Sequence, residues 1–359
     1  MEYSFGRFGY HFLNFLILIQ ATGACVSYFI LIGDTIPILL ALYFPDYPSM
    51  TERSFVISFI AIVLVFPLNL SRSIGAVAKW SIISVLCLPI ILLTLLIRAP
   101  AYSAAHEAPL NWQGPDIFGA LGILAFAFSC SHVCFSVFLS LSDQTSRAWT
   151  ITTSLASVMS WIASISFALI GYLCFGQDVQ PNLFLNFPAD DAIVNVGRFA
   201  LGFSMILTIP MVFYPFREAV QKMIGFEITN KQPTAVQHYA VTVVLFVFLT
   251  GLGIYIRSLG KVYGFIGGFA ATFLAYILPA SACLITRRYP AVLPDMVSSV
   301  TTPSEDDDVV LIEQDEEVNG LKDEIESEAV PFGMLDFAAI FLIIWGFVVM
   351  VFATAGVFR

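Results

Sequence analysis

The chain has 359 residues, of which 58% are apolar and 12% are charged, against about 45–50% and about 25% in average globular proteins. So few charged side chains could not cover the surface of a soluble protein of this length. The composition also excludes a disordered, collagen-like or disulfide-scaffold chain. The sequence therefore predicts an all-α, polytopic membrane protein that lies in a lipid bilayer.

The net charge of −10 is concentrated in one segment. Between Glu305 and Glu328 there are twelve acidic residues and one lysine, whereas the remainder of the chain is close to neutral. The acidity therefore indicates no nucleic-acid partner. The segment is too charged and too poor in aromatic residues to fold alone, so we expect a disordered linker, and the alternative is a docking segment for a cytosolic partner.

Nine stretches are apolar enough to cross a bilayer as helices, which takes about 20 residues for a hydrocarbon core of about 30 Å. We expect these spans at about 11–33, 54–71, 80–98, 117–141, 148–175, 196–216, 236–256, 262–286 and 334–357. The chain is thereby divided into a membrane domain at 1–290 with the first eight spans, an acidic loop at 291–332, and a final transmembrane helix at 333–359.

The positions of lysine and arginine in the loops predict the orientation of the spans. If the N-terminus is cytosolic and the spans alternate, ten of these residues lie on the cytosolic side and six on the other. We therefore expect a cytosolic N-terminus, a cytosolic acidic loop, and a C-terminus that is lumenal or extracellular.

No enzyme motif and no metal-ligand spacing is apparent. The six cysteines form no CxxC pair, and of the four histidines only His132 lies deep in a predicted span. We therefore expect neither enzyme activity nor a bound cofactor. Polar groups and helix breakers within apolar runs are costly in a bilayer, and they indicate a transport pathway.

The sixth predicted span combines hydroxyl side chains with prolines. Pro210 has no N–H and frees the carbonyl of Ile206, and Pro215 frees a second carbonyl further along. Ser204 and Thr208 lie one turn apart on the same helix face. Their hydroxyls and the freed carbonyl are hard oxygen ligands suited to a small cation such as Na⁺. The alternative is that these hydroxyls only bond back to a kinked helix.

The fourth predicted span contains four polar residues in a row, at Ser129, Cys130, Ser131 and His132. They weaken the helix halfway through the membrane, and the N–H dipoles of unwound helix halves can hold a carboxylate, so these residues are the candidate substrate site. His132 is also a candidate proton-sensitive group. The alternative is close helix packing through small residues.

Three further residues are candidates for gating or helix breaks, together with the two prolines of the sixth span. Gly267 and Gly268 allow close approach of helices in the eighth span. Asp34 lies near the end of the first span, where a charge can reach water.

Several short motifs, taken in chain order, resemble one family. They are Ser27-Tyr-Phe-Ile-Leu-Ile-Gly-Asp34-Thr-Ile-Pro37, Phe66-Pro-Leu-Asn-Leu-Ser-Arg72, Phe126-Ala-Phe128, Gly171-Tyr-Leu-Cys-Phe-Gly176, Asn182-Leu-Phe-Leu-Asn186-Phe-Pro188, Thr208-Ile-Pro210, Pro215-Phe-Arg217-Glu218 and Gly264-Phe-Ile-Gly-Gly268. Together they resemble the amino acid/auxin permease family, and within it the sodium-coupled neutral amino acid transporters and the fungal vacuolar amino acid transporters. In one departure, Ser131 separates Cys130 from His132, where the family has an adjacent Cys-His pair.

The resemblance implies a LeuT-type fold built from two inverted five-helix repeats, in a vacuolar, lysosomal or plasma membrane. It also implies a secondary active transporter that moves neutral amino acids by alternating access, coupled to Na⁺ or H⁺. The first span here corresponds to the family's third, so we expect a chain that lacks the first two helices, as a truncated gene model, an alternative start or a remnant. This expectation favours a second candidate function, a sensor or scaffold that detects amino acids without transporting them.

Overall fold

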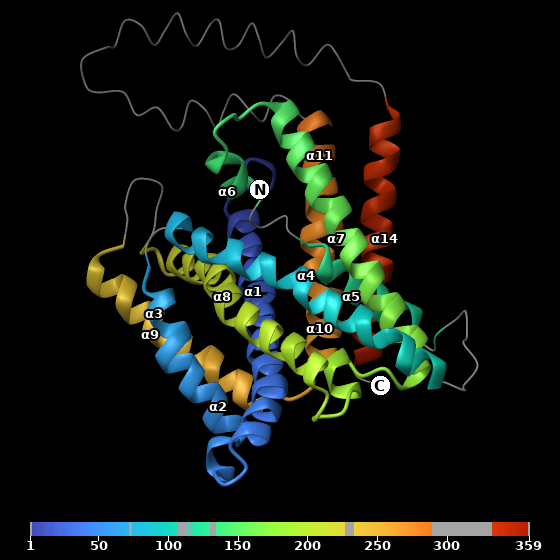
Figure 1. Cartoon of the computed structure of the whole chain (residues 1–359). Coiled ribbons are helices and arrows are strands. Elements are labelled where there is room, and N and C mark those ends of the chain that lie inside the picture. Colours follow the sequence, from blue (N-terminus) through green and yellow to red (C-terminus); the bar gives the residue numbers. More distant parts are fainter. Residues whose placement is uncertain are drawn as a thin grey trace, which may run out of the picture.

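The computed structural model describes residues 2–71, 74–105, 114, 116–129, 134–226, 233–288 and 332–357. Within these ranges the secondary structure is helical, with no strand (Figure 1). The predicted acidic loop at 291–332 lies outside the described residues except for Phe332, and so do the predicted substrate residues Cys130, Ser131 and His132.

The helices follow the order of the predicted spans. They are α1 (Glu2–Tyr43), η1 (Pro48–Met50), α2 (Arg53–Ile60), η2 (Ala61–Val65), α3 (Phe66–Asn69), α4 (Ile74–Ala105), α5 (Ile117–Ala127), α6 (Cys134–Ser140), α7 (Ser146–Phe175), η3 (Gly176–Asp178), η4 (Leu183–Asn186), α8 (Ala192–Ile224), α9 (Ala235–Tyr255), α10 (Leu259–Ile266), η5 (Gly267–Ala271), η6 (Phe273–Ile277), α11 (Leu278–Arg288) and α14 (Met334–Val357). In the described part of the chain, seven helical stretches are long and apolar enough to cross a membrane. Two shorter apolar helices, Arg53–Asn69 and Ile117–Ala127, stand at the second and fourth predicted spans.

Helix α1 is the centre of the larger hydrophobic core. It packs along α8 and also contacts α9, α10 and α2. Side chains on several faces of α1 are buried, among them Leu16, Cys25, Phe29 and Ile30. A helix that is apolar on all sides lies in the interior of a protein, which is where α1 is found.

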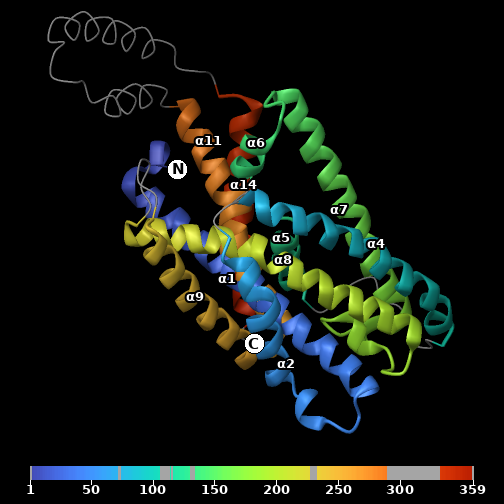
Figure 2. The ribbon, with the colours of Figure 1, turned by 60° about the vertical axis from the view of Figure 1, so that its left-hand side comes forward.

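A second layer forms on the other side of α8. Helix α4 packs on α8, and α7 packs on α4 at a distance from α1 (Figure 2). Cys87, Ile91 and Leu95 of α4 meet Val194 and Ala200 of α8 in a second cluster of buried side chains. Helix α8 is therefore enclosed by α1 on one side and α4 on the other.

Glycines bring α5, η5 and α14 into close contact. A methyl group on Gly267 would overlap the backbone carbonyl of Gly122 in α5, and one on Gly122 would lie 3.2 Å from the backbone nitrogen of Gly268. Ala353 of α14 lies against both Gly122 and Gly268. The predicted close approach at Gly267 and Gly268 is thus a contact between helix backbones, of the kind that small residues permit in membranes.

The eighth predicted span contains two π-helical segments, η5 and η6. Thr272 lies between them, and its hydroxyl donates a hydrogen bond to the carbonyl of Gly267 at 2.7 Å. A third π-helical segment, η2, precedes Pro67 in the second predicted span. Such wide turns are uncommon within helices and occur often at functional sites.

Two arginines tie the ends of distant helices together. Arg53 at the start of α2 donates hydrogen bonds to the carbonyls of Gly253, Ile254 and Ile256 at the end of α9. Arg217 of α8 donates to the carbonyl oxygens of Asn69 and Ser71 at the end of the second predicted span, to both at less than 3 Å, and to the hydroxyl of Thr242 in α9. Both sets of contacts join helix ends that alternating spans would place on the same side of a membrane.

Asp191 caps the start of α8. Its Oδ1 accepts hydrogen bonds from the backbone N–H groups of Ile193 and Val194, and Arg98 Nε lies 2.7 Å from Oδ2. Burial acts to raise the pKa of Asp191, but the hydrogen bond from Arg98, the backbone N–H groups and the charge of Arg98 outweigh burial. The pKa of Asp191 is therefore lower than its ordinary value.

This pKa shift predicts a pH dependence of stability. Because the pKa is lower in the folded than in the unfolded protein, the ionised carboxylate stabilises the fold above the ordinary pKa of about 3.9, and the stabilisation is lost as the pH falls through the folded value. We expect Asp191→Asn to lower the melting temperature in detergent equally between about pH 7 and about pH 5, and by less below about pH 4. The exposed Asp46 provides the control, Asp46→Asn. A difference that already shrinks between pH 7 and pH 5 would contradict this assignment.

Candidate functional site

The fourth predicted span consists of two separate helices. Helix α5 ends at Ala127 and α6 begins at Cys134, so the apolar run at 117–141 is not one continuous helix. Phe128 has a φ of −100° and a ψ of 3°, outside the helical region, and the N–H of Ser129 donates to the carbonyl of Phe126 at 3.2 Å. Asp116 begins α5 as its N-cap, accepting from the N–H of Gly119 at 2.8 Å.

Ser129 is the predicted substrate residue that the structure describes. Its hydroxyl oxygen is buried and has no hydrogen-bond partner among the described residues. Leaving a buried hydroxyl unpaired costs about 1–3 kcal/mol, so such a group calls for a ligand, a water or a neighbour outside the described ranges. Ser129 is thus a buried polar group that can hydrogen-bond to a small polar ligand.

One aromatic ring from α5 and one from α10 pack together next to this helix end. The ring of Phe126 lies 5.2 Å from that of Tyr263, centroid to centroid. The side chain of Tyr263 in turn interacts with that of Ser27 on α1. The end of α5 therefore faces a partly polar region to which α1 and α10 contribute.

Ser204 and Thr208 lie together on α8, as their spacing predicts, and Ser84 of α4 meets both. The Oγ of Ser84 lies 2.8 Å from Ser204 Oγ and 2.5 Å from Thr208 Oγ1. Thr208 also donates to the carbonyl of Ser204 at 2.8 Å, which is the back-bonding that the sequence left as an alternative. Ser84 and Ser204 are each 6% exposed. We call Ser84, Ser204 and Thr208 the hydroxyl cluster.

The prolines of the sixth span do not interrupt it. Helix α8 runs from Ala192 to Ile224 and contains both Pro210 and Pro215. Packing by α1 and α4 on both sides holds the helix together, and neighbouring helices commonly compensate for a proline in a membrane span. Ile206 is buried, and its carbonyl has no helical N–H partner at Pro210.

The remaining predicted gating residues lie at contacts between helices. Asp34 is 3.9 Å from Arg53 Nε, so it belongs to the contact that joins α1, α2 and the end of α9. Gly267 and Gly268 lie at the crossing with α5 and α14.

The two candidate sites, the end of α5 and the hydroxyl cluster, are on different helices. Helix α1 contacts α8, which carries part of the hydroxyl cluster, and also the α10–η5 segment, which packs against α5.

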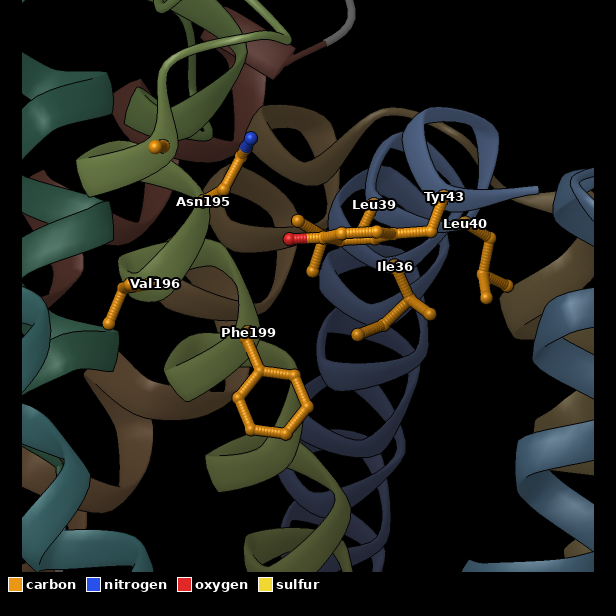
Figure 3. A pocket seen from close by; sticks show the side chains of 8 residues that line it. Ile36, Leu39, Leu40, Tyr43, Asn195, Val196 and Phe199 are labelled. Carbon is orange, nitrogen blue, oxygen red and sulfur yellow. The ribbon is translucent and has the colours of Figure 1, made fainter. Parts of the chain in front are cut away.

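A separate groove of about 460 Å³ lies between α1 and α8 (Figure 3). Ile36, Leu39 and Tyr43 line one wall, and Val196 and Phe199 line the other. The Tyr43 hydroxyl points toward α8. None of the predicted site residues that the structure describes lines this groove, and its largely apolar wall does not suit a zwitterion.

The long apolar helices, the helix pair α5–α6 and the buried hydroxyls define a polytopic integral membrane protein with polar groups in its interior. The sequence profile of the family described as transmembrane amino acid transporter protein matches residues 2–292. The chain belongs to this family, which confirms the resemblance inferred from its motifs.

Named relatives agree with this assignment. The chain is 28% identical over 301 residues to vacuolar amino acid transporter 2 of Saccharomyces cerevisiae. This match covers 78% of the chain and 61% of that relative. It is 30% identical over 306 residues to putative sodium-coupled neutral amino acid transporter 11 of Bos taurus, covering 82% of the chain and 64% of that relative. The human protein of the same name is 31% identical, with 82% and 73% covered. The chain thus spans less than two thirds of the length of the yeast and bovine relatives.

Sequence reasoning predicted that Ser204 and Thr208 lie together on one helix face, but it gave no indication of Ser84. A lone serine within an apolar span carries no signal of its own, because serine is tolerated at many helix contacts. Only the packing of α4 on α8 shows that Ser84 lies at the level of Ser204. The nearby Pro89 was the one sequence feature that could have drawn attention to this part of α4.

Proposed function

We propose that the protein is a secondary active transporter that moves neutral amino acids across a membrane by alternating access, coupled to Na⁺ or H⁺. The family match over residues 2–292 carries this proposal. The relatives named as amino acid transporters support the substrate class, and those named as sodium-coupled support the ion. Their names describe transporters rather than enzymes.

The proposed substrate site is the interrupted fourth span. A helix that stops within an apolar run exposes backbone N–H and C=O groups, which can hold the carboxylate and ammonium groups of an amino acid. The end of α5 at Ala127 and the buried hydroxyl of Ser129 support this site. Cys130, Ser131 and His132 are proposed to complete it.

The proposed ion site is on α8. Ser204 and Thr208 supply hydroxyl oxygens, and Ile206 supplies the carbonyl freed by Pro210. Asp34, Gly267 and Gly268 are proposed as gating positions, because they lie where helices contact one another.

The proposed architecture has nine spans in a LeuT-type inverted repeat, with a cytosolic N-terminus. A vacuolar, lysosomal or plasma membrane is the proposed location, and the yeast relative named as vacuolar supports the first of these. Accessibility of epitope tags at the two termini tests the sidedness, and tags reached from the same side would contradict it.

Uptake of labelled amino acids into proteoliposomes tests the function. We expect uptake driven by an imposed Na⁺ or pH gradient, and Thr208→Ala should raise the Na⁺ concentration for half-maximal uptake about tenfold, the effect of losing about 1.4 kcal/mol of binding. Thr152→Ala is a matched control, because Thr152 is exposed on α7 and bonds back to the carbonyl of Ala148. No gradient-driven uptake would reject the function, and an unchanged Na⁺ requirement in Thr208→Ala would reject the ion site.

A further inference from the structure

The hydroxyl cluster joins two helices that the sequence gives no reason to connect. Ser84 Oγ lies 2.5 Å from Thr208 Oγ1, 2.8 Å from Ser204 Oγ and 3.1 Å from the carbonyl oxygen of Ser204. In the other direction, Ser204 Oγ lies 3.2 Å from the carbonyl oxygen of Ser84. Five oxygen atoms from α4 and α8 thus converge on one place in the interior.

These five oxygens outnumber the three side-chain protons that the cluster contains. The cluster contains five oxygen–oxygen contacts within hydrogen-bond distance, including the bond from Thr208 Oγ1 to the carbonyl of Ser204. Each hydroxyl has a single proton, so the three side chains supply three protons to five contacts, and some protons must be shared between two acceptors. The oxygens therefore have lone pairs that no side-chain proton fully occupies, and a cation can bind to these lone pairs.

The ligand chemistry favours a small monovalent cation. Hydroxyl and carbonyl oxygens are hard ligands, which suit Na⁺ rather than a soft metal. All five oxygens are uncharged, and without carboxylates a divalent cation is bound weakly. The site therefore matches the chemistry of Na⁺ and offers more oxygen ligands than α8 alone.

We infer that Ser84 supplies the third hydroxyl ligand of the cation site proposed at Ser204 and Thr208, so that the coupling Na⁺ is held between α4 and α8. This inference rests on the proposed function. Oxygens in hydrogen-bond contact must exchange those contacts for contacts to the cation, so binding is linked to the packing of α4 on α8. Pro89 in α4 and Pro210 in α8 each remove a helix hydrogen bond near the cluster, which eases such an adjustment.

The test measures how Na⁺ raises the melting temperature of the purified 359-residue chain, with choline chloride at the same ionic strength as the reference. Ser84→Ala removes the ligand, and Ser84→Cys keeps a side chain of similar size but replaces the hard oxygen by a soft sulfur. Cys87→Ala is the matched control, because Cys87 is 8% exposed on the same helix and its thiol bonds to the carbonyl of Ile83.

We expect both Ser84 variants to raise the Na⁺ concentration for half-maximal stabilisation about tenfold, equivalent to about 1.4 kcal/mol, and Cys87→Ala to leave it unchanged. If Ser84→Ala does not fold, the Na⁺ concentration for half-maximal stabilisation of Ser84→Cys tests the inference. If Ser84 only holds the helices together, its variants should melt at a lower temperature in choline chloride, but the Na⁺ concentration for half-maximal stabilisation should not change.

The outcomes separate this inference from the proposed function. If the wild-type chain shows Na⁺-dependent stabilisation and uptake, but the Ser84 variants keep the wild-type Na⁺ requirement, the role of Ser84 is rejected and the transporter remains. If the wild-type chain transports only with a pH gradient and does not respond to Na⁺, the Na⁺ site is rejected. If the wild-type chain shows no uptake under any gradient and no stabilisation by Na⁺, both the proposed function and the Na⁺ site are rejected.

Discussion

Arg198→Met is expected to destabilise the protein by on the order of 4 kcal/mol, because it leaves several buried carbonyl groups without donors. Arg198 is fully buried. Its Nη1 donates to the carbonyl of Pro188 at 2.9 Å, and its Nη2 donates to those of Phe184 and Phe187 at 2.8 and 2.7 Å. This one side chain holds the segment that leads into α8.

The side chain of Asn195 provides a further acceptor for Arg198. The Nη1 of Arg198 donates to Asn195 Oδ1 at 2.6 Å, one turn earlier on α8. The amide nitrogen of Asn195 donates to the carbonyl of Ala189 at 2.8 Å, so both side chains bind the same loop. Lysine cannot reproduce the planar fork that reaches three carbonyls, and Arg198→Lys should recover only part of the stability.

Thermal melting and monodispersity in detergent measure this effect. Arg147→Met is the control, because Arg147 is exposed at the start of α7 and its replacement should change little. A melting temperature for Arg198→Met within the error of the wild type would show that other groups hold the loop. A lysine variant that is fully as stable as the wild type would show that charge, rather than the fork, is what matters.

Hydropathy predicted where the membrane helices are but not how far they extend. The predicted first span at 11–33 forms the middle of α1, which has a kink at Gly6 (φ 60°) and from there continues through Pro37 to Tyr43. The predicted sixth span at 196–216 is likewise shorter than α8, which begins after the cap at Asp191 and includes Arg217. Charged residues end a hydropathy stretch, but arginines bonded to carbonyls inside the protein let a helix continue.

The candidate site was predictable only where its residues are close in sequence. One helical turn places Ser204 beside Thr208, and the row of small polar residues from Ser129 indicated a weak point in the fourth span. Ser84 lies 120 residues from Ser204, and no local pattern reports a contact over that separation. The crossing at Gly267 likewise joins residues far apart in sequence. The carbonyl partners of Arg198 are only 10 to 14 residues away, but they lie in and after the short helix η4, where no regular repeat predicts the contact.

Gly267→Ala is expected to destabilise the protein by about 2–3 kcal/mol, the upper part of the range for an overpacked core. The added methyl group would overlap the carbonyl oxygen of Gly122, which is backbone and cannot move aside as a side chain would. Helix α5 must therefore shift away from η5 and α14. Because α5 ends next to Ser129, we also expect a reduced rate of amino acid uptake.

Gly251→Ala is the matched control for this change. Gly251 is within α9 and has no atom within 4 Å of an added methyl group, so alanine there should be neutral or stabilise the helix by up to about 1 kcal/mol. Melting temperature and uptake are measured for both variants in the same preparation. A stable, fully active Gly267→Ala protein would show that α5 and η5 do not touch as described, and that Gly267 has no part in gating. A stable variant with slow uptake would instead separate gating from packing, because it would show that the close crossing is needed for movement of α5 rather than for the fold.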